Sequence, residues 1–474
     1  TTPEGLKSNP HLKWGLVTLK QEDAMNTGIR QNRPFLRYLI SRMLNRFGDS
    51  IDVFLLSWLV YGLSGSASLS ALAVGLNYLP TILLQPLAGA FVEHIPKRRV
   101  IALTDAGRAL LVAIFLGLYL TENLNAAVLI AGTFLISTLE AFASPASSAA
   151  LSGLLKAEEY DSGMSLYQVG SRIMELAGTG TAGLLIAAAG SGGTLVVDLL
   201  CFVIACLLMS RVPEAAACAG EGSGEGGVSA WLCSLREGFR FIRTSKPLLL
   251  IASTAAFLNA ALTPCNALQA ALFQDVYRKG SGALSAMGIC TTVGMLLGAG
   301  LYSAAAGGRD EAKEGKVSID RILLGCGILM GSYYLVLAWL GLAHPVDAVF
   351  YPVLFTASLL FGVSVGLANT AVSVLLLRVV PTSYMARASA VMNAGCTAAV
   401  PVTSFLVSGI CARASVVSVL AGTAVPVFVV IVVLMGKGTL KRLNDFGQEK
   451  DGGLRDTDNQ DRCEKRKGRA GDAD

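Results

Sequence analysis

The sequence predicts an all-α polytopic membrane protein, with twelve transmembrane helices in two six-helix halves and both termini in the cytoplasm. Of the 474 residues, 53% are hydrophobic and only 15% are charged, whereas a soluble domain carries about 25% charged residues. Apolar runs of the roughly 20 residues needed to cross about 30 Å of hydrocarbon recur along the chain. A polar segment near the middle separates six such runs from six more, which indicates two halves.

The predicted segments follow the chain in order. Helices are expected at 36–63, 69–93, 99–120, 124–149, 163–189, 193–211, 247–273, 283–306, 319–342, 346–377, 385–411 and 415–436. They define an N-terminal half at 35–211 and a C-terminal half at 247–436, with cytoplasmic segments at 1–34, 212–246 and 437–474. The low-complexity stretch AAACAGEGSGEGG predicts a flexible linker at 212–246, and the last segment is expected to be a disordered tail. Within the linker, WLCSLREGFRFIR predicts a short helix in the membrane interface or, alternatively, an ordinary soluble amphipathic helix.

The basic residues indicate the orientation. With the N-terminus inside, most of the 38 Lys and Arg fall in cytoplasmic segments, and the outside loops hold only Arg278, Lys279 and Arg413. This asymmetry is what the positive-inside rule requires. The net charge of +5 is therefore explained by topology and anionic lipid headgroups, and no nucleic-acid partner is expected.

Several classes of chemistry have no counterpart in the sequence. The ten cysteines form no C-x-x-C pair, and the three histidines are dispersed along the chain. We therefore expect no disulfide, metal site or cofactor, and no cluster of a nucleophile with a base, so the chain is not predicted to be an enzyme. No phosphate-binding G-x-x-x-x-G-K-[ST] stretch occurs, which argues against ATP hydrolysis.

Three stretches resemble one transporter branch. PFLRYLISRMLNRFGDSIDVFLLSWLVYGLSGS is similar to its opening helix, GAFVEHIPKRRV to the signature loop between helices 2 and 3, and SPASSAALSGLLKAEEYDSGMSLYQVGSRIMELAGTGTAGLLIAAAG to the region from helix 4 to helix 5. Their order and spacing resemble the macrolide-efflux and enterobactin-exporter type proteins of the major facilitator superfamily, over roughly residues 34–436. The resemblance implies that superfamily's two-half fold and transport by alternating access.

The resemblance also implies a cytoplasmic gate at the signature loop. There Glu93 stands for the usual Asp, His94 for an Arg and Pro96 for a Gly. An acid at this end of helix 2 can meet a helix N-terminus or a basic side chain of the other half. Alternatively, the basic triplet 97–99 only sets the topology. The residues expected in the gate are Gly89, Glu93, Lys97, Arg98, Asp105 and Arg108.

The hexad GTGTAG at 178–183 fits the dinucleotide-binding pattern G-x-G-x-x-G, but a helical stretch precedes it where a strand is needed. Gly178, Gly180 and Gly183 are instead predicted to form a packing seam in a transmembrane helix. The hexad resembles the antiporter-associated motif of helix 5, with Thr179 in place of Pro and Ala182 in place of Gly. The proline kink of that motif is therefore absent.

Charged side chains inside predicted spans mark the candidate site, because such residues are costly in a bilayer and usually face the bundle interior or water. Helix 1 carries a stripe of Arg42, Arg46, Asp49 and Asp52, helix 5 carries Gln168, Arg172 and Glu175, and helices 4 and 6 carry Glu140 and Asp198. One hypothesis is that Arg46–Asp49, and Arg172 with an acid, are salt bridges that hold the half together. The other is that one carboxylate exchanges a proton, with Glu140 favoured, Asp49 second, and Asp52 and Glu175 as further candidates. Asp198 is predicted to be a structural contact near the outer end of helix 6.

The second half offers neutral amides in place of charges. They are Asn259, Asn266, Gln269, Asn369 and Asn393, and they either contact a substrate or hydrogen-bond between helices. Together with Arg46, Gln168 and Arg172 they suggest a mixed, largely apolar cavity that suits an amphipathic organic solute.

These observations predict a secondary active exporter of drug-like or metabolite-like molecules in a bacterial-type plasma membrane, coupled to protons and acting as a monomer. Its expected partners are the lipid bilayer, a small organic substrate and protons. An uncoupled facilitator or importer is the alternative within transport, and a non-transporting membrane sensor is the alternative from another class.

Overall fold

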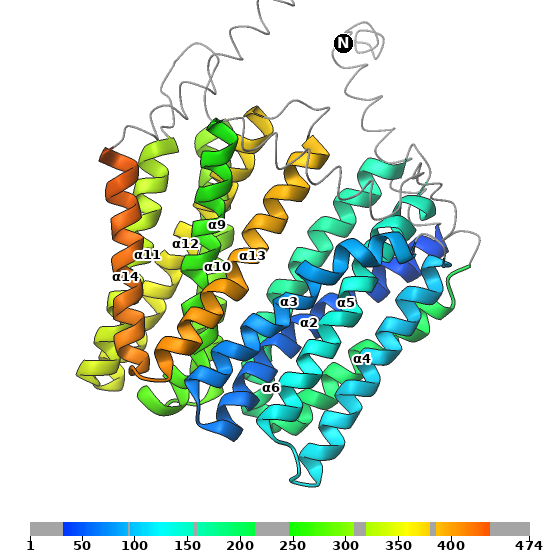
Figure 1. Cartoon of the computed structure of the whole chain (residues 1–474), viewed down its shortest axis with the longest axis horizontal. Coiled ribbons are helices and arrows are strands. Elements are labelled where there is room, and N and C mark those ends of the chain that lie inside the picture. The colour runs from blue at the N-terminus through cyan, green and yellow to red at the C-terminus, as the bar shows by residue number, and fades with distance from the viewer. Residues whose placement is uncertain are drawn as a thin grey trace, which may run out of the picture. The chain divides into compact units, whose positions relative to one another are not determined.

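A computed structural model describes residues 32–92, 95–155, 159–213, 246–307, 319–379 and 385–436. Within these ranges the regular structure is entirely helical and contains no strand (Figure 1). The predicted all-α class is confirmed. The chain divides into two compact units, of which unit 1 holds residues 1–231 with 280–285, and unit 2 holds 232–279 with 286–474.

Unit 1 is a bundle of long helices. Helix α2 packs mainly against α6, α3 packs against α5, and α4 contacts both α5 and α6. The bundle therefore brings α2, α4, α5 and α6 together around a shared interior. The bounds of its helices are α2 Arg33–Ser64, α3 Ala67–Val92, α4 Lys97–Leu120, α5 Ala126–Leu154 and α6 Tyr160–Ser210.

Local sequence explains where these helices begin and end. The Asn32 side chain accepts a hydrogen bond from the Phe35 N–H at 3.1 Å, and Gly65 ends α2 in the left-handed conformation with φ 60°. These are the usual helix start and stop signals. Helix α5 was expected to end at residue 149 but continues to Leu154, and Pro145 lies inside it. A proline need not end a transmembrane helix, because neighbouring groups satisfy the freed backbone.

Helix α6 is two helices joined at a kink. At Gly190 the backbone has φ 69° and ψ 175°, which is a non-helical conformation. Only glycine adopts that region readily because it has no Cβ. The two helices predicted at 163–189 and 193–211 lie on either side of this residue.

Unit 2 holds the remaining helices. Helix α11 packs between α12 and α14, and α9 packs against α13, α12 and α14. The four side chains of Tyr277, Tyr333, Tyr334 and Phe361 lie in its interior, and the rings of Tyr333 and Phe361 are stacked with centroids 4.1 Å apart. The elements are α9 Lys246–Ala271, the π-helical turn η3 Leu272–Val276, α10 Ser281–Gly307, α11 Ile319–Ala343, α12 Asp347–Val379, α13 Met385–Cys411 and α14 Val416–Gly436.

A polar contact ties two connections of unit 2 together. The Lys279 Nζ lies 2.5 Å from the Asp347 Oδ1 and lies over the rings of Phe350 and Tyr351. The hydrogen bond with Asp347 raises the pKa of Lys279 above its ordinary value. This contact joins the turn before α10 to the start of α12.

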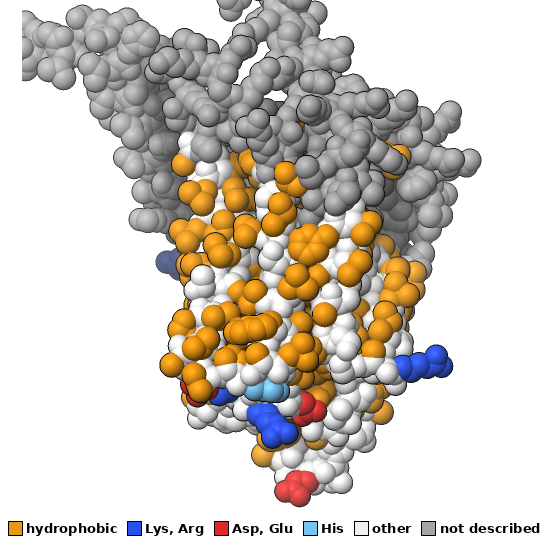
Figure 2. Space-filling view, turned by 90° about the vertical axis from the view of Figure 1, so that its left-hand side faces the viewer, with side chains coloured by type: hydrophobic (Ala, Val, Ile, Leu, Met, Phe, Trp, Pro, Cys, Tyr) orange, Lys and Arg blue, Asp and Glu red, His pale blue; other side chains and the backbone are white. Residues whose placement is uncertain are grey.

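The surface and the helix lengths fit a membrane protein. Within the described ranges, seven helices are long and apolar enough to cross a bilayer, with the kinked α6 counted once, and two shorter apolar helices lie at Gly395–Cys411 and Val416–Val430. Figure 2 shows one face on which apolar side chains cover the helices and charged ones gather at one end. Each of the twelve predicted ranges overlaps a helix of the described residues, whereas the count of twelve crossings and the side of the termini stay predictions.

Candidate functional site

A polar cavity of about 190 Å³ lies in the interior of unit 1. Helices α2, α5 and α6 supply its walls, and seven of the residues that the sequence marked for a site line it. A cavity of this size is smaller than the roughly 300–1,000 Å³ of a drug-sized site, so it can hold water or one polar group of a larger solute. The lining residues are Arg42, Asn45, Arg46, Asp49, Glu140, Ser144, Ser147, Ser148, Tyr167, Gln168, Ser171, Arg172 and Glu175.

Arg108 of α4 connects two acids of this cavity. Its Nη1 donates to the Asp49 Oδ1 at 2.6 Å, and its Nη2 donates to the Glu140 Oε2. The Arg108 side chain is only 1% exposed, and its guanidinium carbon lies 5.5 Å from the centroid of the Phe202 ring. Arg108 therefore joins α2, α4 and α5 with one buried cation.

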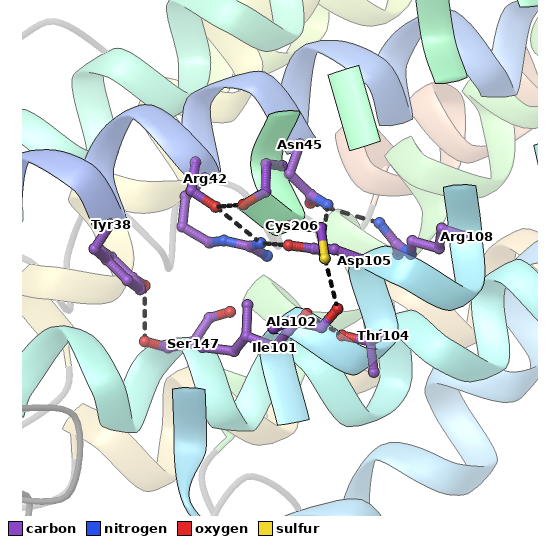
Figure 3. Close-up of polar contacts among 12 residues, drawn as sticks. Tyr38, Arg42, Asn45, Ile101, Ala102, Thr104, Asp105, Arg108, Ser147 and Cys206 are labelled. Atoms are coloured by element: carbon purple, nitrogen blue, oxygen red, sulfur yellow. Dashed lines mark hydrogen bonds and ion pairs between the residues drawn. The ribbon is translucent and has the colours of Figure 1, made fainter. Parts of the chain in front are cut away.

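Asp105 lies one turn before Arg108 in α4 and binds α2 (Figure 3). Arg42 Nη2 donates to its Oδ2, and Asn45 Nδ2 donates to its Oδ1 at 2.9 Å. Asn45 Oδ1 also lies 3.5 Å from Arg108 Nη1. The two pairs thus form one network, in which the Asn45 amide connects Asp105 with Arg108.

The third cluster joins α2 to the first part of α6. Arg46 Nη2 lies 2.7 Å from the Glu175 Oε2, and Arg172 Nη1 lies 3.0 Å from the same oxygen. The predicted pairing of Arg172 with an acid is present. The predicted Arg46–Asp49 pair is not, because Arg46 points to α6 whereas Asp49 points to α4.

Two further acids lie deeper in unit 1. Asp52 of α2 is 2% exposed and Asp198 of α6 is 0% exposed. The two carboxyl groups are neighbours in this interior. Asp198 was expected to be a structural contact near the outer end of its helix. The structure shows that its side chain is fully buried, and its role as a structural contact stays a prediction.

The predicted amides of unit 2 do not form such a cluster. Asn259 donates to the Ala255 carbonyl of its own helix at 3.0 Å. Asn266 and Asn369 are exposed, and Gln269 is half-buried. The side chain of Asn393 lies outside the described residues.

The structure locates the signature-loop residues only in part. Glu93 and the surroundings of Gly89 lie outside the described residues. Lys97 Nζ donates to the Val92 carbonyl at 3.1 Å, and Arg98 Nη1 donates to the Val212 carbonyl at 3.1 Å. Asp105 and Arg108 were grouped with this gate, but they belong to the buried network described above because α4 carries them about two and three turns further into the bundle.

The glycine hexad lies where α6 crosses α2. A Cβ at Gly178 would lie 2.7 Å from the Phe47 carbonyl oxygen, and one at Gly183 would lie 3.1 Å from the Phe54 ring. Gly180 is buried. The close approach of the α2 backbone at Gly178 leaves no space for a larger side chain there.

Sequence reasoning missed several polar partners. Asn45 is the main omission, although it lies three residues after Arg42 on the same helical face and could have been found by that spacing. Gln85 Nε2 donates to the Ser144 Oγ at 3.1 Å, and the Tyr38 hydroxyl donates to the Ser147 carbonyl at 2.8 Å. Uncharged polar residues of this kind are not distinguished by the sequence pattern from the other polar residues of the predicted spans.

Comparison with known proteins places the chain in a family. A family profile described as Major Facilitator Superfamily matches residues 38–404. The chain belongs to the Major Facilitator Superfamily. The predicted family is thereby confirmed, and this family is one of membrane transporters and not a class of enzymes.

Two curated relatives in the Major Facilitator Superfamily match about half of the chain. A stretch of 217 residues, 44% of the chain, is 28% identical to the multidrug efflux pump Tap of Mycolicibacterium fortuitum and covers 52% of that protein. A stretch of 229 residues, 46% of the chain, is 24% identical to the MFS-type transporter YkuC of Bacillus subtilis (strain 168) and covers 51% of it. The chain therefore matches about half the length of these relatives.

Solved transporter structures share the fold. The nucleoside transporter NupG superimposes with a TM-score of 0.65 at 13% identity, over 85% of this chain and 98% of that one. A bacterial homologue of the iron transporter ferroportin, in its inward-facing state, superimposes with a TM-score of 0.61 at 17% identity, over 84% and 98%. At these identities the likeness concerns the fold alone.

Proposed function

We propose that this protein is a proton-coupled exporter of amphipathic organic molecules, located in the plasma membrane and working by alternating access. The observation that carries the proposal is the buried Arg108 held between Asp49 and Glu140 beside a polar cavity. Family membership supports transport, and the partial likeness to a multidrug efflux pump favours export of drug-like molecules.

Glu140 is the acid best placed to exchange a proton with the cavity. It lines the cavity with 34% of its side chain exposed, whereas its partner Arg108 is buried. Protonation of Glu140 removes one of the two negative charges that hold Arg108, so that Arg108 keeps Asp49 as its charged partner. The cavity then gains one unit of positive charge, which changes its affinity for a polar or cationic group of the substrate.

Proton and substrate therefore compete for the same cavity. A group that binds the Glu140 carboxylate favours loss of the proton, and a proton on Glu140 favours release of that group. Such a reciprocal dependence is a coupling free energy between two ligands, typically about 1–3 kcal/mol. It is the physical basis for exchanging protons against substrate.

A growth-inhibition panel of amphipathic antibiotics and cationic dyes, on cells with and without the protein, identifies an exported compound. That compound is then followed in proteoliposomes with an imposed proton gradient. We expect uphill transport by the wild type that stops when the gradient is collapsed, and a decrease of about tenfold or more in Glu140→Gln.

Glu122→Gln is the matched control, because Glu122 lies in the exposed turn after α4 and the chemical change is the same. Transport that continues unchanged without the gradient would favour the uncoupled facilitator. Protection from no compound in the panel would contradict export of this class of molecule.

A further inference from the structure

Two acids of unit 1 lie beyond Arg108, Asp52 of α2 and Asp198 of α6. Both side chains are essentially inaccessible to solvent. One oxygen of Asp52 and both oxygens of Asp198 have no hydrogen-bond partner among the described residues. A buried polar atom without a partner costs about 1–3 kcal/mol, and more when it is charged, so these oxygens need a hydrogen.

Among the described residues of unit 1, no interior cation is left to provide it. Four arginines line or border the cavity, and each one is bonded to an acid other than this pair. Those acids are Asp49, Asp105, Glu140 and Glu175, so that charges of both signs balance without Asp52 and Asp198. If both carboxyl groups of the pair are ionised, they therefore add two negative charges that none of these arginines balances.

The groups that face the pair come from three helices. Asp49 acts on it from α2, Arg108 from α4, and Cys201 faces Asp198 on α6. Arg108 is the cation that acts on the pair, but its Nη1 and Nη2 are engaged by Asp49 and Glu140, and its Nε makes no hydrogen bond to either acid. Two neighbouring buried carboxylates cannot both ionise while Arg108 is held by Asp49 and Glu140, and one proton held between them satisfies an oxygen of each.

We propose that Asp52 and Asp198 bind one shared proton and that this proton exchanges with the cavity through Asp49 during transport. The second part rests on the proposed proton coupling. The pair is then a proton site that is closed off from the cavity. Glu140 is a separate site, because it lines the cavity directly.

The packing provides for this contact. A Cβ at Gly48 would lie 3.0 Å from the Asp198 Oδ1 and 3.2 Å from the Cys201 Cβ. The missing side chain at Gly48 thus lets Asp198 approach the α2 backbone one helical turn before Asp52. Asp49, the next residue, lines the cavity and lies one helical turn from Asp52, so it connects the two places.

The exchange step balances in atoms and charge. An O–H bond of the pair breaks, the proton passes to the Asp49 carboxylate, and an O–H bond forms there. Arg108 loses the charge of Asp49 as a partner and becomes the counter-ion of the newly ionised pair. The return step restores the Arg108–Asp49 contact that the structure shows.

The first test is vibrational and needs no substrate. Infrared spectra of the purified protein in lipid at neutral pH report the carbonyl stretch of protonated carboxyl groups. Difference spectra compare each variant with the wild type. We expect this band in the wild type and in Glu122→Gln, and its loss in Asp52→Asn and in Asp198→Asn. Each single change introduces an amide that donates to the remaining carboxylate, so both variants should fold. A band that persists in both variants would overturn the shared proton.

The second test follows transport of the compound identified by the growth panel in the same proteoliposomes. We expect both Asn variants to keep downhill equilibration but to lose uphill, gradient-driven transport by about tenfold or more. Wild-type coupling in a variant that lacks the band would show that the proton never leaves the pair and would overturn the exchange. If the wild type shows no gradient-driven transport, the proposed function and the exchange step are both contradicted. The infrared band would still decide whether the pair binds a proton.

Discussion

At the scale of single residues, Arg108 determines how unit 1 tolerates acids inside a membrane. It contacts α2 and α5 at once, and removal of one partner from a buried ion pair typically costs about 3–5 kcal/mol, because the other charge stays buried without compensation. Two acids depend on Arg108, whereas Arg172 is 72% exposed and shares Glu175 with Arg46. The two arginines should therefore differ greatly in their contribution to stability.

We expect Arg108→Ala to lower the stability of unit 1 by about 3–5 kcal/mol, because Asp49 and Glu140 lose their cation. Arg172→Ala is the control, with a change of about 0–1 kcal/mol. Thermal unfolding of both variants in the same detergent measures the difference. Equal melting temperatures for the two variants would contradict the central role of Arg108.

The spacing of charged residues along one helix indicated which face of that helix carries charge. It did not indicate which charged side chains form pairs. Arg46 and Asp49 are three residues apart and are neighbours on α2, yet each finds its partner on another helix. Asn45 completes the network although it carries no charge. A sequence pattern shows only the neighbours on the same helix. It does not show which residue of another helix lies close enough in the fold to be the actual partner.

At the scale of elements, α10 and α12 approach each other along glycines. A Cβ at Gly298 would lie 2.9 Å from the Leu367 backbone nitrogen, and one at Gly362 would lie 3.0 Å from the Gly294 Cα. Backbone atoms cannot move aside as a flexible side chain can. Helices in lipid gain much of their association energy from such close packing of small residues.

We expect Gly298→Ala to destabilise unit 2 by about 1–3 kcal/mol, since the added methyl group must push the two backbones apart. Gly300→Ala on the same helix is the matched control, because no atom lies within 4 Å of its Cβ position. There the better helix propensity of Ala should leave stability unchanged or raise it by up to about 1 kcal/mol. Melting curves of the pair measure the difference, and a similar loss for both would show that the seam does not limit the packing.

At the scale of the whole molecule, orientation in the membrane follows from the distribution of basic residues. The sequence assigns the connection that contains Arg413 to the outside and the end of α5, with Ser152, to the inside. Both positions are exposed in the structure, so each can carry a reporter without disturbing the interior.

In a background without the ten native cysteines, a membrane-impermeant maleimide should label Arg413→Cys in intact cells. It should label Ser152→Cys only after the cells are permeabilised. The reverse pattern would place both termini outside and would contradict the predicted topology.

The sequence by itself determined the class of the molecule and the positions of its helices. Long apolar runs in a chain with few charges must form helices, because a bilayer offers no other partner for the backbone. The same runs located the kink at Gly190 between two predicted helices and marked the buried charges as exceptions.

Only the tertiary structure decided which charges meet, because the partners are far apart in the chain. Arg108 and Asp49 are separated by 59 positions, and Arg46 and Glu175 by 129. Helix packing brings them within hydrogen-bonding distance, and the same packing buries Asp52 and Asp198 with no hydrogen-bonded cation among the described residues.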